Sequence, residues 1–346
     1  MDYKKAGVDI EAGNKAARII GKLAKKTFNE RVVRELGSFG GFYDISELDI
    51  SKPVLVSSTD GIGTKLLVAQ KAGKYKGLGY DIVNHCVNDI AVCGATPLFF
   101  MDYFATSHLS DEIIEEIMEG MTEALMEINC PLIGGETAEL PDLYAPGDFD
   151  LAGFITGVVD RDSIIDGSSI SKYDKIIVIP SNGLHTNGYT LARKVVFDIL
   201  GLEVKFIPPQ LEQSIGDELL VPHTSYLEAI KAVKTFAKGI AHITGGGLLD
   251  NIARILPENC NAVIDVSFIP IPPIFNIIQR AGSIPSDEMY HVFNMGAGLA
   301  VVVSKDNLQK ALSALSSAGF QAILCGEIVE GDRQVELNNL PQFSSS

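Results

Sequence analysis

The order of apolar runs along the chain is the feature that most restricts its fold. In the first half, short apolar runs typical of buried strands alternate with segments of helical periodicity. The stretch 160–172 is polar and rich in turn-forming residues, and the alternation starts again at residue 174. Strands that alternate with helices predict an α/β (α+β) fold, and 346 residues are enough for two domains.

The elements expected from this pattern fall into two sets. Strands are predicted at 53–58, 98–105, 130–133, 150–159, 174–180, 240–244 and 293–303. Helices are predicted at 66–73, 77–93, after Ser110, and at 189–200, 225–236, 248–256 and 305–318. We therefore expect one domain at 1–166, a second at 167–342 and a frayed tail at 343–346.

The charge balance excludes several classes of partner. Lys and Arg number 28 and Asp and Glu number 44, so the formal net charge is −16. Such a surface repels nucleic acid and anionic membranes, and no basic run is longer than Lys25–Lys26. A phosphorylated substrate would have to be neutralised locally, by glycine loops, helix N-termini and a divalent metal.

Cysteine use and hydropathy favour a cytoplasmic protein. The five cysteines are widely spaced, none lies in a CxxC pair, and their number is odd, which is typical of reduced thiols. The sequence has no uncharged apolar stretch of 18 residues, so no transmembrane helix is predicted. The N-terminal residues have no apolar segment typical of a signal peptide.

Four glycine-rich loops are the first sign of chemistry. They cover residues 36–41, 60–65, 181–188 and 242–247. Glycine lets backbone N–H groups approach a phosphate closely, and a following helix adds a favourable dipole. None of the loops is a Walker A sequence or a GxGxxG motif, and each alone is also explained as a turn. Four of them in one acidic chain favour phosphate binding.

Carboxylates and histidines accompany these loops. Asp60 and Glu136 follow predicted strands, and Asp81 and Asp89 flank His85 on one face of a predicted helix. Carboxylates suit magnesium, but Asp81 and Asp89 are equally well explained as solvated helix residues. His185 and His242 lie in glycine loops and could transfer protons, contact phosphate or serve as structural hydrogen bonders. No GxSxG sequence indicates a Ser-His-Asp triad.

Seven stretches, read together, resemble one known family. They are 3–9 (YKKAGVD), 58–65 (STDGIGTK), 89–97 (DIAVCGATP), 134–139 (GGETAE), 185–189 (HTNGY), 242–247 (HITGGG) and 294–298 (NMGAG). In this order they resemble the phosphoribosylformylglycinamidine cyclo-ligases, or aminoimidazole ribonucleotide (AIR) synthetases. The pattern Asp-x4-Gly-Ala-x-Pro at 89–97 is shared by a wider superfamily, whereas 136–139 and 185–189 are typical of the cyclo-ligases.

The resemblance implies a fold and a reaction. The fold would have an N-terminal α/β domain, whose sheet pairs with that of a second subunit in a homodimer, and a C-terminal α+β domain. The enzyme would use ATP and Mg²⁺ to phosphorylate the formyl oxygen of formylglycinamidine ribonucleotide. Ring closure would then give aminoimidazole ribonucleotide, ADP and phosphate in purine biosynthesis. Phosphoryl transfer of this kind needs positioning and charge neutralisation more than a protein nucleophile.

The resemblance also implies roles for individual residues. The metal ligands would be Asp60, Asp81, Asp89 and Glu136, and the catalytic residues would be His185, Lys65 and Asp60. ATP would be bound by Gly37, Phe39, Gly40, Gly41, Asp60, Gly61, Gly63, Thr64, Lys65 and Asp89. The substrate would be bound by Glu136, Thr137, His185, Asn187, His242, Thr244, Gly245, Gly246 and Gly247.

One departure from the family pattern and three alternative functions remain open. Residues 223–225 read His-Thr-Ser where the family has Thr followed by a basic residue, which puts a phosphate contact there in doubt unless His223 replaces it. Selenophosphate synthetase is disfavoured because no cysteine precedes Cys86, and thiamine-monophosphate kinase because it would lack the 136–139 stretch. A non-catalytic nucleotide-binding protein is disfavoured because the acidic residues and glycine loops are all retained.

Overall fold

The computed structural model describes residues 10–341, so the 3–9 motif and the predicted tail lie outside the described residues. The chain forms two compact units. The N-terminal unit contains the described residues up to Ile90 together with Ala95–Asp162, and the C-terminal unit contains Ala91–Gly94 and the chain from Ser163 onward. The sequence predicts a domain boundary after residue 166, a few residues beyond the point at which the two units divide. That these units are the predicted domains stays a prediction.

The N-terminal unit is a four-stranded sheet with helices along one face. Its strands are β1 (Pro53–Gly61), β2 (Thr96–Thr106), β3 (Leu132–Glu139) and β4 (Phe149–Asp160), in the order β1-β4-β2-β3. Its helices are α1 (Ile10–Ala24), α2 (Leu66–Ala72), α3 (Lys76–Ala91) and α4 (Asp111–Glu127). Only the β2–β3 pair is parallel; β4 pairs antiparallel with both β1 and β2.

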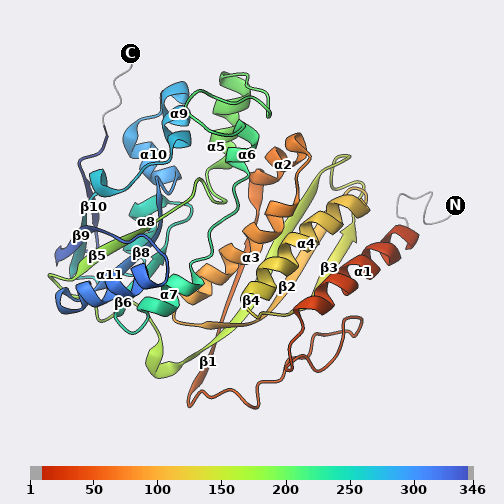
Figure 1. Ribbon diagram of the computed structural model, residues 1–346, viewed down its shortest axis with the longest axis horizontal. Helices are drawn as coiled ribbons and strands as arrows, with labels where there is room; N and C mark the ends of the chain where they lie inside the picture. Colours follow the sequence, from red (N-terminus) through yellow and green to blue (C-terminus); the bar gives the residue numbers. More distant parts are fainter. Residues whose placement is uncertain (1–9, 342–346) are drawn as a thin grey trace. The chain divides into compact units, whose positions relative to one another are not determined.

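Glycines let the helices of this unit pack closely. A Cβ on Gly153 of β4 would clash with the ring of Phe100 and would lie 2.8 Å from Ile82 of α3, so the helix lies directly on the sheet. Cβ atoms on Gly79 of α3 and Gly120 of α4 would clash with backbone atoms of the facing helix. Helices α3, α4 and α1 therefore run side by side along the sheet (Figure 1).

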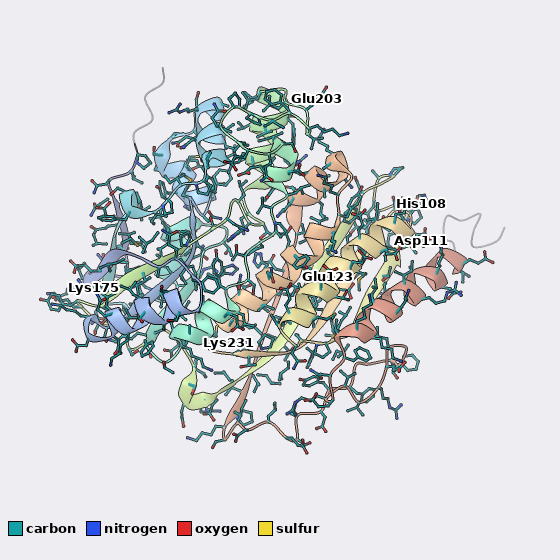
Figure 2. All side chains as sticks on the ribbon, viewed as in Figure 1. His108, Asp111, Glu123, Lys175, Glu203 and Lys231 are labelled. Carbon is teal, nitrogen blue, oxygen red and sulfur yellow. The ribbon has the colours of Figure 1, made fainter. Side chains whose placement is uncertain are left out.

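Charged side chains cover the outer surface of α4. Glu123 accepts a hydrogen bond from Lys76 Nζ at 2.7 Å and another from Tyr80 at 2.8 Å, and Asp111 lies in the first turn of the helix (Figure 2). Ser110 occupies the predicted N-cap position, but its side chain makes no capping hydrogen bond; its carbonyl accepts the N–H of Ile114 instead. The apolar face predicted for this helix is buried, with Ile114, Ile117 and Met121 almost fully enclosed.

The opposite face of the sheet is open in this chain. Along β1 the exposure alternates residue by residue, as in an antiparallel sheet with one covered face. Leu55 on β1 is 61 % exposed, and Phe154 on β4 and its partner Met101 on β2 are exposed on the same face, further along the strands. These three residues define what we call the open sheet face.

The C-terminal unit is built on a six-stranded sheet. Its order is β10-β7-β9-β5-β8-β6, from β5 (Lys175–Pro180), β6 (Ala237–His242), β7 (Cys260–Asp265), β8 (Ala297–Val303), β9 (Ile323–Glu330) and β10 (Val335–Asn338). Every residue of β8 is buried, as expected for a strand covered on both faces. Its helices are α5 (Tyr189–Arg193), α6 (Ile215–Leu219), α7 (Leu227–Val233), α8 (Gly247–Ala253), α9 (Pro273–Gly282), α10 (Ser286–Val292) and α11 (Leu308–Ser317) (Figure 1).

The mixed α/β class with two sheets confirms the predicted fold class, and several elements differ in extent. The strand predicted at 130–133 continues through Gly134 and Gly135 to Glu139, because pairing with β2 outweighs the low strand propensity of glycine. The helix predicted at 189–200 changes to a π-helix at Lys194–Ile199. Among the described residues, no helix combines the length and apolar character needed to span a membrane.

Candidate functional site

A cluster of carboxylates and a histidine lies where β1 meets α3. Asp60, near the end of β1, places Oδ2 at 2.7 Å from His85 Nε2. Asp89, one turn further along α3, places its Oδ2 at 4.0 Å from the same nitrogen and accepts a hydrogen bond from Ser58 Oγ at 3.0 Å. The i, i+4 spacing predicted from sequence therefore brings His85 and Asp89 together beside Asp60.

The charges of this cluster support one another. Burial lowers the pKa of His85, but the hydrogen bond and charge of Asp60, together with Asp89, outweigh it and raise that pKa above its ordinary value. Burial raises the pKa of Asp60, but the contact with His85 outweighs burial and holds the pKa below its usual range. Asp60 and Asp89 are 40 % and 28 % exposed, so both carboxylates remain accessible to a cation.

Lys65 and Asp81 form a separate, fully buried ion pair. Lys65 Nζ lies 2.9 Å from Asp81 Oδ1 and 2.8 Å from Oδ2, and both side chains have no exposed surface. Burial lowers the pKa of Lys65, and Asp81 partly counteracts this effect. The resemblance implies a role in ATP binding for Lys65 and in metal binding for Asp81; in the structure the two charges pair with each other, and both side chains are fully buried.

Glu136 does not join Asp60 in a single metal shell. Asp60, Gly153, Asp102 and Gly135 lie in one register row across β1, β4, β2 and β3. Because side chains alternate along a strand, Glu136 projects from the face opposite to that of Asp60, with two strands between them. The described N-terminal unit thus brings Asp60 and Asp89 together beside His85, with Glu136 on the other side of the sheet, and the four-ligand metal shell stays a prediction.

A large cavity opens between α1, the glycine loop at 36–41 and strands β2 and β3. Its volume is about 1120 Å³, which is ample for a nucleotide. Of the predicted ATP-binding residues, the cavity is lined by Gly37, Phe39, Gly40 and Gly41. Its lining does not include Asp60, Gly61, Gly63, Thr64, Lys65 or Asp89. The predicted substrate residues Glu136 and Thr137 also line this cavity.

The C-terminal unit gathers three histidines. The rings of His185 and His223 are stacked with centroids 4.0 Å apart, and His223 Nε2 lies 2.9 Å from His242 Nε2. All three side chains are at least 94 % buried. His185 has a backbone φ of +61°, a left-handed conformation that is uncommon outside glycine. His223, the departure from the family pattern, is thus an interior bridge between the two predicted histidines and not a surface phosphate contact.

The triple-glycine turn lies next to this cluster. Asn251 of α8 donates from Nδ2 to the carbonyl oxygens of Gly245 and Gly247, at 3.2 and 2.8 Å, and so fixes the turn. A Cβ on Gly245 would lie 3.3 Å from Asn187 Oδ1, so the two predicted substrate loops approach each other closely. The loops that carry the predicted substrate residues His185, Asn187, His242, Thr244 and 245–247 therefore adjoin within this unit, and their role in substrate binding stays a prediction.

Sequence reasoning missed two residues of these sites. Asn251 had no distinguishing signal, because an asparagine within a short helix pattern is common. Asp102 had one: it is the only charged residue in the apolar run 98–105. An unexplained carboxylate in a buried strand indicates either a partner or a ligand, because burial of an isolated charge is costly.

Comparison of the sequence with known protein families gives two matches. The N-terminal domain of AIR synthase related proteins matches residues 44–159, and their C-terminal domain matches residues 174–337. Individual relatives match along almost the whole chain. A phosphoribosylformylglycinamidine cyclo-ligase from Geobacter sulfurreducens is 45 % identical over 340 residues, which is 98 % of this chain and 98 % of the relative. One from Thermoanaerobacter pseudethanolicus is 47 % identical over 97 % of this chain and 100 % of the relative.

Solved structures share the fold at much lower identity. A thiamine-monophosphate kinase from Stenotrophomonas maltophilia has a TM-score of 0.69 at 16 % identity and covers 92 % of this chain and 94 % of its own. The hydrogenase maturation protein HypE, solved in complex with ATP, has a TM-score of 0.68 at 16 % identity and covers 95 % of each chain. At this identity the likeness concerns the fold alone.

Proposed function

This chain belongs to the phosphoribosylformylglycinamidine cyclo-ligases of the AIR synthase related family, and we propose that it catalyses their ATP-dependent ring closure. The observation that carries the proposal is the identity of 45–47 % over 97–98 % of the chain to relatives of that name. Formylglycinamidine ribonucleotide would be converted to 5-aminoimidazole ribonucleotide, with ATP converted to ADP and phosphate, in de novo purine biosynthesis.

The reaction must remove the formyl oxygen of the substrate so that the ring can close. The formyl oxygen of an amide is a poor leaving group, so it first attacks the γ-phosphorus of ATP and releases ADP. The amidine nitrogen of the substrate then attacks the formyl carbon, and the oxygen departs as inorganic phosphate. No protein nucleophile is required, and the protein contributes positioning and charge stabilisation.

The cavity beside the 36–41 loop is our proposed ATP site. Its volume of about 1120 Å³ accommodates a nucleotide, and the loop backbone at Gly37, Gly40 and Gly41 offers N–H groups without obstructing side chains. The neighbouring fold of HypE, solved with ATP, supports nucleotide use by this architecture. Glu136 and Thr137 on β3 line the same cavity and would contact the bound reactants.

Asp60 and Asp89 are the residues that fit a magnesium ion. Both offer hard carboxylate oxygens, both are partly exposed, and the lowered pKa keeps Asp60 ionised at neutral pH. When bound, Mg²⁺ would neutralise phosphate charge. We leave Asp81 and Glu136 out of the proposed set because one is held by Lys65 and the other projects from the opposite sheet face. Lys65 is proposed as the partner that keeps Asp81 buried.

The substrate side is proposed for the C-terminal unit. His185, Asn187, His242, Thr244 and the glycine turn at 245–247 lie in adjoining loops, and the turn, in which Gly245 is exposed, has no side chains to obstruct a ribose 5-phosphate. His185 is our candidate for proton transfer. Its ring is held against His223, so its orientation is fixed before the substrate binds.

We also propose that the protein is a homodimer and that it is located in the cytoplasm. The open sheet face, with Leu55, Met101 and Phe154 exposed, is suited to pairing with a second copy of the chain in a homodimer. All five cysteines are free thiols, and four of them are buried, which agrees with a reducing cytoplasm.

The proposal is tested by measuring ADP release with and without formylglycinamidine ribonucleotide, together with formation of aminoimidazole ribonucleotide. We expect ADP release to depend on the ribonucleotide and Asp60→Asn to lower kcat/KM by roughly tenfold or more, since it removes a metal-facing charge. Asp162→Asn, at an aspartate in an exposed pair with Lys52, is the matched control and should behave as wild type. Absence of turnover in protein shown to bind ATP would refute the cyclo-ligase function.

A further inference from the structure

Asp102 is a buried carboxylic acid at the wall of the nucleotide-sized cavity. It lies on β2 in the register row of Asp60, Gly153 and Gly135, and its side chain projects toward the helix-covered face. The residue is 5 % exposed, and it lines the cavity together with residues of α1 and β3. None of the roles proposed above uses it.

Within the part of the chain that the structure describes, the Asp102 carboxyl lacks a counter-charge. Its one hydrogen bond there comes from its own backbone N–H, and burial raises its pKa to about 7. Buried acids are normally paired with a cation or with several donors. A buried, unpaired carboxyl at a cavity wall indicates that its partner is a ligand.

The surroundings leave room for that ligand. A Cβ on Gly135, directly opposite on β3, would clash with Asp102 Oδ1, so the carboxyl needs glycine at this position to adopt its orientation. On the facing helix, Gly13, Ala17 and Gly21 line the cavity at intervals of four residues, and Cβ atoms added to Gly13 or Gly21 would meet nothing within 4 Å. A flat group can therefore lie between α1 and the sheet.

The hydrogen-bonding groups of the Asp102 carboxyl indicate which kind of ligand it would bind. A protonated carboxyl presents one donor and one acceptor side by side, as a carboxamide does. The edge of an adenine ring presents the complementary pair, the 6-amino donor and a ring-nitrogen acceptor, which is how Asn and Gln recognise adenine. A metal ion is disfavoured here because Glu136, the other carboxylate lining the cavity, projects from the opposite face of the sheet.

We propose that Asp102 recognises the adenine base of the nucleotide by hydrogen bonding to its 6-amino edge. The inference rests on the proposed use of ATP and names the residue that sets the base preference. In this arrangement the base lies between α1 and the glycine pair of β3, and the 36–41 loop closes the same cavity.

The test compares equilibrium binding of ATP with that of purine riboside triphosphate, which differs from ATP only by lacking the 6-amino group. Wild type should prefer ATP by roughly tenfold or more, since the analogue leaves a buried acceptor unpaired. Asp102→Asn should keep a preference for ATP because the amide offers the same donor and acceptor. Asp102→Ala should bind both nucleotides equally. The exposed-site control Asp162→Ala should retain the wild-type preference.

Two results would overturn the proposal: a wild-type enzyme that does not distinguish the nucleotides, or an Asp102→Ala variant that retains the full preference. Asp102→Ser replaces the alanine variant if the latter does not fold. Failure of the cyclo-ligase function is detected separately, because loss of ring closure with an intact ATP preference would leave the base contact standing.

Discussion

Asp60 and Asp102 show how position determines the chemistry of one residue type. Both lie in the same register row of one sheet, separated by Gly153, and both project toward the helices. Asp60 contacts His85, which keeps the pKa of its carboxyl low, whereas burial without a counter-charge raises the pKa of Asp102 to about 7. One carboxyl is suited to a cation and the other to a neutral hydrogen-bonding partner.

The raised pKa of Asp102 predicts a pH-dependent stability. Between its ordinary value of 3.8 and about 7, the folded chain binds a proton that the unfolded chain releases. The free energy of unfolding should therefore fall as pH rises through this window and level off above it. Asp102→Asn removes this effect, so between pH 4 and pH 8 wild type should lose up to about 4 kcal/mol relative to the variant.

Urea unfolding of the nucleotide-free protein at several pH values measures this difference. The two proteins share every other titrating group, so those contributions cancel. Parallel pH profiles for wild type and Asp102→Asn would show that the Asp102 carboxyl is ionised or paired in the folded protein.

At the scale of residues, the sequence predicted some of the contacts within the candidate sites and not others, and the functional roles stay predictions. The cluster of His85 and Asp89 followed from helical spacing, and Asp60 from its place after a strand. The pairing of Lys65 with Asp81 could not be predicted, because it depends on how the turn after β1 packs against α3. The side of the sheet on which Glu136 lies depends on the β2–β3 register, which a single sequence does not specify.

The close crossing of α3 and α4 fixes the helix that carries His85 and Asp89. Gly79 and Gly120 face each other's backbone there, and only hydrogen fits at these positions. The contact determines how deeply α3 lies against the sheet, and therefore how near His85 lies to Asp60.

Gly120→Ala should consequently destabilise the protein by about 2–3 kcal/mol or more, because its Cβ would clash with the carbonyl oxygen of Lys76. Gly21→Ala in α1 is the matched control, since its Cβ meets nothing within 4 Å and alanine is the better helix former. We expect that control to stabilise the protein by up to about 1 kcal/mol. Denaturant unfolding measures both, and equal effects of the two substitutions would contradict the close helix crossing.

Elements with strong periodicity were predictable, and those with mixed signals were not. The regular apolar face of 111–127 identified α4, and the buried run at 174–180 identified β5. Helix α9 was missed because prolines 270, 272 and 273 precede its apolar face and read as a loop, although Pro273 occupies the first helical position, where proline is tolerated. The break of α5 into a π-helix has no signal in residue propensities.

The assembly of the whole molecule depends on the open sheet face. A single subunit leaves Leu55, Met101 and Phe154 exposed on neighbouring strands, whereas the helix-covered face is buried. An apolar sheet face of this kind is expected to be covered by another protein surface. Pairing with a second copy through this face is the arrangement we propose.

Phe154→Glu should therefore convert the dimer to a monomer by placing charge in the interface. Phe268→Glu is the matched control, because Phe268 is also exposed, at 60 %, but lies in the C-terminal unit outside the sheet face. Sedimentation equilibrium gives the mass of each. A Phe154→Glu variant that remains dimeric, or a wild type that is monomeric at micromolar concentration, would exclude this face as the interface.

The most direct test of the central claim follows one oxygen atom. Formylglycinamidine ribonucleotide labelled with ¹⁸O in its formyl group is turned over with ATP, and the phosphate is analysed by ³¹P NMR for the isotope shift. Phosphorylation of the formyl oxygen predicts one ¹⁸O in each phosphate released, with stoichiometric aminoimidazole ribonucleotide and ADP. Unlabelled phosphate, with the label lost to water, would contradict the mechanism, and no ring closure at all would contradict the function.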